Sequence, residues 1–377
     1  MTHIGSTVFS SVDAGTYRQV ADWIFGGGPK TYAVAERPFL YPLMLGTLDR
    51  IGGAGAVWLL NFLLWIAALN ITGLTVYRFV KRSWAAAIVF AVMATNISLI
   101  VLTFHALAET LAVALLALWA YGLTHLSIRI TPAQAAWAVL PLALLTIAKP
   151  EFELVLGVTA VAVLVLALRS PAPAAIVAVV TVCLVPVAAQ VALMATVNHY
   201  AGLSVVGDDT LRAYYGARLY AVIAHSDDIV GQRARTEGLA TMTLLRVTAA
   251  HPLETVWVLA STLKDNLLSG SNFVGGSNPT LAGAIVVTNY VYAIALAALV
   301  PLAAIAISAG RDGRLVLLCA GILNILVTGS LSFWQGDRLT VIALPLWLVA
   351  LALAASQAAP RLARLSQGRR AMPPKVG

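Results

Sequence analysis

Apolar residues gather in long blocks along this chain, and these blocks dominate after Pro42. A membrane-spanning helix needs about 20 consecutive apolar residues, because the hydrocarbon layer that it crosses is about 30 Å thick. Nine runs approach that length, at residues 55–79, 84–104, 106–126, 131–148, 152–168, 174–197, 281–308, 314–333 and 338–356. We therefore expect an all-α polytopic membrane protein with about nine transmembrane helices.

The charged residues between the apolar runs predict the orientation of the chain. Cytoplasmic connections of membrane proteins carry an excess of Lys and Arg. Basic residues gather here in alternate connections and in the tail, at Arg78, Lys81, Arg82, Arg129, Arg169, Arg311, Arg314, Arg361, Arg364, Arg369, Arg370 and Lys375. These segments and the C-terminus are predicted to be cytoplasmic. Nine spans leave the N-terminus outside, and we favour one further helix upstream of Met1, which would place it inside.

The opposite, extracytoplasmic face receives two long segments. Residues 1–54 are predicted to form a catalytic loop with a surface helix, because apolar and polar residues recur at helical spacing between positions 14 and 26. Residues 198–280 form a second loop with two amphipathic helices, and a connection of this length is a candidate lid. The other segments are transmembrane helices at 55–197 and 281–356 and a basic cytoplasmic tail at 357–377.

Composition agrees with a membrane protein and excludes an ordinary soluble one. Of the 377 residues, 60% are hydrophobic and only 11% are charged, whereas soluble domains are about half apolar and about a quarter charged. The net charge of +8 sits in short clusters beside apolar runs, so no nucleic-acid partner is expected. Cys183 and Cys319 both lie inside apolar runs, which argues against a disulfide or a metal site.

Asp13 is the first candidate for chemistry, because it precedes the predicted surface helix in a charged stretch of the outer loop. A carboxylate at the lipid–water boundary can accept a proton from an incoming hydroxyl group, which is the work of a general base. Asp is also a common residue at the start of a helix, where it caps backbone N–H groups. The two roles are compatible, and the sequence leaves both open.

Three cations are predicted on the face where positive charge is disfavoured. They are Arg37, next to Glu36, together with Lys149 and Arg338. Cations at a membrane boundary often only anchor a helix to the head groups. Cations kept on the outer face are also suited to hold an anion, and a lipid phosphate is the natural candidate. Pro38 favours an extended Arg37, so that its side chain can point into a cleft.

His105 and Glu109 are four residues apart and share one face of the third predicted span. An ionisable group inside a span is a functional candidate, because placing a charge in hydrocarbon is costly. Two ligands are too few for a convincing metal site, so we expect these residues to bind substrate or to brace other helices. No motif specifies a cofactor, and a divalent metal is left open.

Short motifs in order along most of the chain resemble the polytopic glycosyltransferases of the C-type fold. This group includes the protein O-mannosyltransferases and the lipid A aminoarabinose transferase. The motifs are Asp13, Tyr17 and Ala21 at helical spacing, RPFLYPLML at 37–45, Glu109 in FHALAETLAVALL, Lys149-Pro150-Glu151, and DRLTVIALPLWL at 337–348.

The resemblance implies a mechanism. Enzymes of this group take a sugar from a polyprenyl-phosphate carrier and pass it to an acceptor, usually with inversion, and an acidic residue in the first outer loop is the base. Asp13 stands at that position, and Arg37, Lys149 and Arg338 would stabilise the departing phosphate. The family has a helix before this loop and often a second acid, for which Asp22 and Glu36 are both open.

The expected protein is thus an enzyme of the bacterial inner membrane, a hexosyl- or pentosyltransferase that acts on the outer face. Its partners would be a polyprenyl-phosphate sugar, a glycan, lipid or protein acceptor, and the lipid bilayer. Two rival interpretations remain. A transporter or flippase would use the same ionisable residues along a translocation path, and a polysaccharide polymerase or ligase would share the donor but take a larger glycan.

Overall fold

The computed structural model describes residues 12–127, 129–268, 279–310, 312–333 and 335–370, and all regular secondary structure in these ranges is helical. The all-α prediction is therefore confirmed for the described part of the chain. Its helices are α2 (Val12–Ile24), α3 (Ala33–Glu36), α4 (Leu40–Val80), α5 (Ser83–Ala94), α6 (Ile97–Thr103), α7 (Glu109–Leu123), α8 (Pro132–Thr146), η1 (Pro150–Phe152), α9 (Glu153–Ala167), α10 (Pro173–Asn198), α11 (Val206–Asp209), η2 (Thr210–Gly216), α12 (Ala217–Ile223), α13 (Ile229–Glu237), α14 (Thr241–Ala250), α15 (Pro252–Leu268), α16 (Pro279–Gly310), α17 (Gly313–Ser330), α18 (Arg338–Val341) and α19 (Leu344–Arg370).

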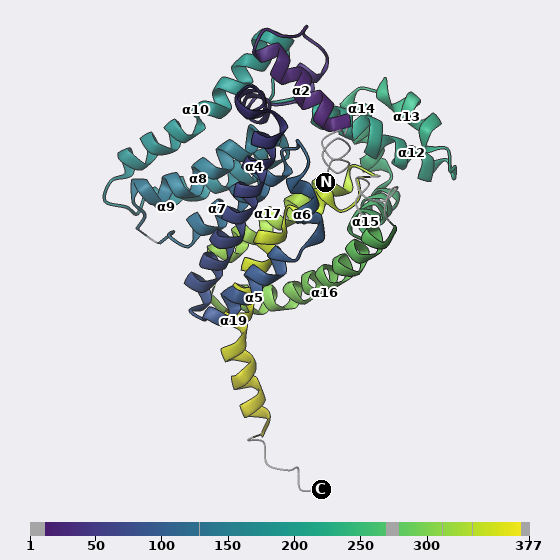
Figure 1. Cartoon of the computed structure of the whole chain (residues 1–377). Coiled ribbons are helices and arrows are strands. Elements are labelled where there is room, and N and C mark those ends of the chain that lie inside the picture. The colour runs from purple at the N-terminus through teal and green to yellow at the C-terminus, as the bar shows by residue number, and fades with distance from the viewer. Residues whose placement is uncertain (1–11, 128, 269–278, 311, 334, 371–377) are drawn as a thin grey trace.

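Five of the described helices are long and apolar enough to cross a membrane, or six if the bent pair α5 and α6 is one span. The apolar helices α7, α8 and the first part of α19 fall short of that length. The nine apolar runs thus do not all become regular spans, and the expected number of spans is not confirmed. The predicted tail is described as far as residue 370, where it forms the end of α19, and Figure 1 shows this end of the helix projecting from the bundle; residues 371–377 lie outside the described residues.

The predicted span at 84–104 is broken. Helices α5 and α6 meet at an angle of 59°. The break falls at Asn96, whose side-chain oxygen accepts a hydrogen bond of 2.7 Å from the backbone N–H of Leu99 and so caps α6. Asn favours such a cap over a helix interior, because its side chain competes for backbone N–H groups.

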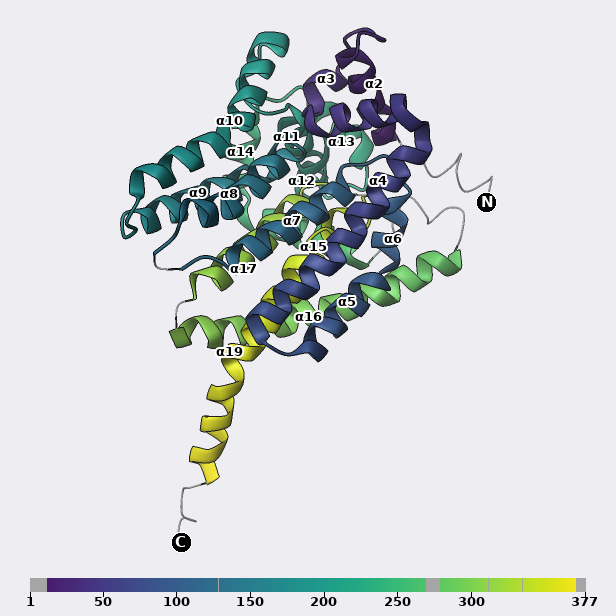
Figure 2. The same ribbon diagram turned by 60° about the vertical axis from the view of Figure 1, so that its left-hand side comes forward.

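Helix α4 begins well before the apolar run that predicted it. It has 41 residues and is interrupted at Gly52 and Gly53, where the backbone is not helical. Gly53 has a φ of 60° and a ψ of −155°, a conformation that glycine adopts easily and other residues avoid. The break divides α4 into a short leg, which belongs to the predicted first loop, and a long apolar leg that runs down the bundle (Figure 2).

Helix α7 lies inside the bundle, where Trp119 is fully buried. Its close approach to α8 depends on Gly122, because an added Cβ would lie 2.7 Å from the carbonyl carbon of Trp137. The first residue of α7 is Glu109, so this packed helix brings a carboxylate to the end of the bundle that lies under the first loop.

The described part of the segment 198–280, which the sequence predicts as the second outer loop, folds against the first loop. Helices η2, α12, α14 and α15 share a small core of Tyr215, Leu219, Leu244 and Val258. Figure 1 shows α12, α13 and α14 at the same end of the molecule as α2. The two segments are joined by backbone and side-chain hydrogen bonds, from the N–H of Val205 to the carbonyl of Ala35 at 3.0 Å and from the Tyr32 hydroxyl to Asp209 at 2.7 Å. The first loop is therefore held between the bundle and this outer layer.

Candidate active site

Asp13 lies in the first turn of α2, and two arginines from distant parts of the chain hold its carboxylate. Arg37 Nη2 donates to Oδ1 at 2.7 Å, and Arg338 Nη2 forms an ion pair with Oδ2. The hydroxyl of Thr16 donates to the Asp13 carbonyl oxygen at 2.8 Å, which ties the same turn together. The carboxylate thus binds guanidinium groups in the described structure, and helix capping does not explain its position.

Arg37 has the extended backbone that Pro38 predicts, with a φ of −107° and a ψ of 120° at the end of α3. This conformation turns its side chain toward α2. Its Nε donates to the Thr16 hydroxyl at 2.9 Å, and its guanidinium lies 4.9 Å from the centre of the Tyr17 ring. Arg37 is therefore fixed on three sides, by Asp13, Thr16 and Tyr17.

Arg338 is the first residue of α18 and connects two carboxylates. Besides its contact with Asp13, its Nε lies 3.5 Å from Oε1 of Glu109. The preceding residue, Asp337, is buried and accepts hydrogen bonds from the Ser98 hydroxyl and from the Asn289 amide. The backbone carbonyl of Asp337 also accepts from the N–H of Val341 at 2.8 Å, so that Asp337 anchors the turn that carries Arg338.

Lys149 completes the set of charged groups. Its Nζ lies 3.7 Å from Oε1 of Glu109 and 3.7 Å from Oε1 of Glu151. Glu109 is almost fully buried, with 3% of its side chain exposed, and its Oε2 has no hydrogen-bond partner among the described residues. These residues are connected to Asp13, Arg37 and Arg338. The three carboxylates and three cations form one network, which we call the charge network.

The charge network changes the proton affinity of Asp13. Burial alone would raise the pKa of Asp13, but the nearby Arg338 and Arg37 outweigh burial and hold the pKa below the usual Asp value. Asp13 is thus ionised at neutral pH. It is also a weak proton acceptor for as long as both arginines hold it.

Five of the seven predicted site residues belong to the charge network, namely Asp13, Arg37, Glu109, Lys149 and Arg338. Glu36 lies beside it at the end of α3 and forms no ion pair within the described residues. Burial raises the pKa of Glu36, and the nearby Arg37 opposes this effect.

His105 and Asp22 occupy different positions. His105 is buried in the link before α7, next to the charges of Glu109 and Arg338, and its backbone oxygen accepts from the Asn61 amide at 2.8 Å. Asp22 is exposed on α2 and forms no ion pair in the described part of the chain. Of the two candidates for a second acid, Glu36 is therefore the one next to the charge network.

A metal centre has no support in the described ranges, where no group of three or more His, Cys, Asp or Glu side chains could hold a metal ion. The pair of His105 and Glu109 gains no third ligand there. The site instead concentrates three cations, which are suited to bind an anion directly.

Sequence reasoning missed several residues that shape the site. The sequence pattern gives no role to Thr16 or Asp337, although they position Arg37 and Arg338. Tyr17 shows only helical spacing in the sequence, yet its ring contacts the Arg37 guanidinium and lies 5.0 Å from the Tyr41 ring between centroids. Glu151 stood in a noted motif without a role. The available signal was proximity in sequence, because each of these residues lies within four positions of a predicted site residue.

No protein-family model matches the chain, and no curated protein matches it. A search of solved structures finds a crystal structure of ArnT from Cupriavidus metallidurans bound to undecaprenyl phosphate, with a TM-score of 0.44 and 12% sequence identity. The match covers 99% of this chain and 79% of ArnT. Likeness at this level does not decide the family, so the function has to be inferred from the side chains of the site.

Proposed function

We propose that this protein is a membrane glycosyltransferase that moves a sugar from a polyprenyl-phosphate donor to an acceptor at the outer face of the cytoplasmic membrane. The observation that carries this proposal is the charge network, in which Asp13 meets two cations, Arg37 and Arg338, and the buried Glu109 links Arg338 to a third cation, Lys149. Transfer of a sugar from a lipid phosphate needs a carboxylate that accepts the proton of the acceptor and cations that bind the phosphate, and the charge network contains both. They lie beside apolar helices that can hold the lipid chain.

In the proposed reaction, Asp13 is the general base and the cations bind the leaving phosphate. An acceptor O–H or N–H group attacks the anomeric carbon from the face opposite to the phosphate, and its proton passes to an Asp13 oxygen. The bond between the anomeric carbon and the phosphate oxygen breaks, and its electron pair remains on the phosphate. Arg37, Lys149 and Arg338 stabilise the negative charge that develops there, so that no general acid is needed. Attack from the opposite face inverts the anomeric centre.

The ion pairs of Asp13 suggest how donor binding prepares the base. A guanidinium group offers its donors to the most negative partner within reach, and a phosphate competes strongly with a carboxylate for such a fork. Arg338 already lies between Asp13 and Glu109. When its guanidinium turns toward the donor phosphate, Asp13 loses a cation and its pKa rises. The base then becomes effective only when the donor is in place.

Two further features support a site at this end of the bundle. Lys149 and Arg338 both lie in connections that the charge pattern assigns to the outer face. The first loop, which carries Asp13 and Arg37, is covered by the outer helices through the contacts of Tyr32 and Val205. These outer helices are a candidate lid, and they are where an acceptor would enter.

Transfer of radiolabelled sugar tests the proposal directly. Membranes that contain the chain are supplied with a panel of polyprenyl-phosphate hexoses and pentoses, and the label that leaves the lipid fraction is measured. Asp13→Asn keeps the shape of the side chain and removes the base, so we expect transfer to fall by about 10²- to 10⁴-fold. Asp22→Asn is the matched control, because Asp22 is an exposed carboxylate on the same helix.

Each outcome decides between the candidate functions. Transfer that is lost in Asp13→Asn and kept in Asp22→Asn supports the base assignment and names the donor sugar. Equal transfer in Asp13→Asn and in the wild type would overturn the base. No transfer from any donor, together with movement of a labelled lipid across vesicle membranes, would favour a flippase instead.

A further inference from the structure

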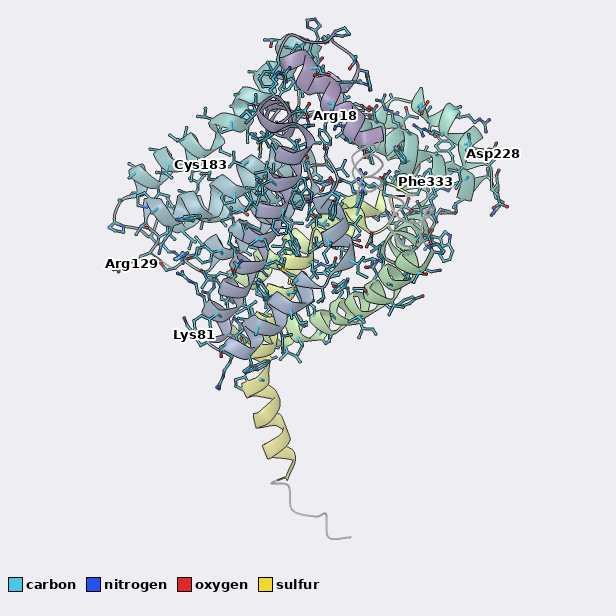
Figure 3. All side chains as sticks on the ribbon, in the orientation of Figure 1. Arg18, Lys81, Arg129, Cys183, Asp228 and Phe333 are labelled. Carbon is cyan, nitrogen blue, oxygen red and sulfur yellow. The ribbon has the colours of Figure 1, made fainter. Side chains whose placement is uncertain are left out.

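A second basic site lies at the other end of the bundle, away from the charge network. An open cavity of about 470 Å³ is lined by Leu74, Tyr77, Arg78, Phe79, Lys81, Thr124 and Arg314. Figure 3 marks Lys81 at the lower end of the bundle and Arg18, on α2, near its top. The long leg of α4 that separates the two ends, residues 54–80, is about 40 Å long at 1.5 Å per residue. That length matches a bilayer with its head groups, which is about 40 to 45 Å thick.

One face of α4 provides most of the cavity wall. Tyr77, Arg78 and Lys81 come three, four and seven residues after Leu74, so all four lie on the same side of the helix. Along this face the side chains change from apolar through aromatic to cationic toward the helix end. Leu74 and Tyr77 are 44% and 46% exposed, respectively. The order matches an amphiphile with its chains toward the membrane and an anionic head at the surface.

The cations of the cavity are only partly neutralised by the protein. Arg314 pairs with Asp312 at 2.9 Å. Arg78 Nη1 lies 2.7 Å from Nε2 of His125, and arginine can only donate in such a contact, so His125 supplies no negative charge to Arg78. In the described ranges no carboxylate pairs with Arg78 or with Lys81. Two positive charges therefore face the cavity without a protein counter-charge.

Lys81 has an unusual backbone for its residue type. It ends α4 with a φ of 58° and a ψ of 31°, the left-handed conformation in which glycine is the favoured residue. Basic residues at the end of a helix also complement the helix dipole and the positive-inside rule. The helix dipole and the positive-inside rule can account for Lys81 without any cavity. They do not explain why Arg314 and Thr124, from other parts of the chain, complete the wall of the cavity.

We propose that this cavity binds the phosphate-bearing head group of an anionic phospholipid in the leaflet opposite the charge network. The phosphate would lie between Arg78, Lys81 and Arg314, and an acyl chain would follow Leu74 along the surface of α4. Basic pockets between helices at a membrane surface are suited to such head groups. The site is separate from the proposed transfer reaction and does not depend on it.

Thermal denaturation of the purified full chain in detergent tests this binding. Short-chain phosphatidylglycerol is titrated against short-chain phosphatidylcholine and against inorganic phosphate. We expect phosphatidylglycerol to raise the denaturation temperature at concentrations where the other two compounds have no effect. An equal effect of phosphatidylcholine, or an effect of inorganic phosphate that matches phosphatidylglycerol, would overturn the lipid assignment.

Two double variants locate the site. Arg78→Gln with Lys81→Gly removes both unpaired charges, and Lys81→Gly does so at a φ that glycine adopts freely. We expect the phosphatidylglycerol concentration for half of the effect to rise by about fivefold for each charge removed. Arg129→Gln with Arg169→Gln removes the same charge from exposed positions that do not line the cavity. An equal weakening in this control would reduce the effect to general surface charge and overturn the site.

A measurement on the wild-type protein keeps the proposal testable if a variant fails to fold. Phosphatidylglycerol with a photoactivatable head group is incorporated into phosphatidylcholine vesicles that contain the protein, and the labelled peptides are identified. Label on residues 74–82, 124 or 314 supports the cavity. Label that is absent from these residues and present elsewhere overturns it.

Discussion

Arg338, near the end of the chain, forms an ion pair with Asp13, near its beginning. The same guanidinium lies 3.5 Å from Glu109, so one side chain links α2, α7 and α18 at the centre of the charge network. Arg37 holds the other oxygen of Asp13. The two arginines make Asp13 a weaker proton acceptor, but they are well placed to bind an anion. The first two predictions test these two effects separately.

Arg338→Gln should lower kcat strongly, because it removes a cation that would stabilise the departing phosphate. Loss of one group that stabilises developing negative charge typically costs about 10²- to 10³-fold in kcat. The measurement is the rate of sugar transfer at saturating donor. Arg18→Gln, which removes an exposed cation from α2, is the control and should keep the wild-type rate. A rate for Arg338→Gln within about twofold of the control would contradict the assigned role.

Arg37→Gln should move the acid limb of the kcat/KM profile to higher pH. Arg37 helps to hold the pKa of Asp13 below its usual value, and the base is active only when it is ionised. Without this cation the pKa rises, so protonation, and with it loss of activity, begins at a higher pH as the solution is acidified. A neighbouring Arg lowers an Asp pKa by about 1 to 3 units, which sets the expected size of the shift.

Glu36 could produce a similar limb, because burial raises its own pKa and Arg37 lies next to it. The control is therefore Glu36→Gln, alone and together with Arg37→Gln. The limb should stay in place in Glu36→Gln and should still shift in the double variant. A shift that disappears in the double variant would assign the limb to Glu36 and not to Asp13.

The predictable part of the site follows from where charges are tolerated. Arg37, Lys149 and Arg338 attract notice because they are cations on the face that the charge pattern predicts to be the outer one, and the structure brings all three into one network with Asp13 and Glu109. The spacing of the apolar runs likewise predicts helices throughout. Each residue type indicates by its polarity whether it lies in the lipid layer or in water, and this is enough to predict the helices and the candidate cations.

The rest of the site and the break in the predicted span depend on contacts between distant residues, which no local sequence pattern encodes. The pairing of Asp13 with Arg338 requires the fold to bring together the two ends of the chain. The break at Asn96 looks apolar in a hydropathy window, because a single cap residue hardly changes the average. Asp337 reads as an ordinary loop residue until Ser98 and Asn289 are seen to donate to it.

Asp337→Ala should impair transfer without direct contact to the substrate. The substitution leaves the buried donors of Ser98 and Asn289 without their acceptor, and each unpaired group costs about 1 to 3 kcal/mol. The turn that carries Arg338 then loosens, so kcat should fall while KM for the acceptor changes little. The measurement is a full kinetic analysis together with the denaturation temperature.

Asp337→Asn separates positioning from simple destabilisation. Asn keeps one acceptor oxygen, so it should recover part of the transfer rate that Asp337→Ala loses. Ser98→Ala removes one donor from the same cluster and leaves the Asp337 carboxylate in place, so it should cost less than Asp337→Ala. If Asp337→Ala lowers the denaturation temperature and leaves kcat unchanged, Asp337 supports the fold and not Arg338.

Gly122→Ala should destabilise the bundle, because α7 and α8 touch through this residue. The added Cβ would lie 2.7 Å from the carbonyl carbon of Trp137, which is backbone and cannot rotate away. Overpacking of this kind typically costs about 1 to 3 kcal/mol. The measurement is the denaturation temperature of the purified chain in detergent, which should fall.

Gly157→Ala in α9 is the matched control for this contact. Nothing lies within 4 Å of the added Cβ, and replacing a helical glycine by alanine should stabilise the protein by about 0.5 to 1 kcal/mol. The denaturation temperatures should therefore move in opposite directions, down for Gly122→Ala and up for Gly157→Ala. Equal shifts in both variants would mean that α7 and α8 do not meet at Gly122, and the position of Glu109 at the head of α7 would then have to be revised.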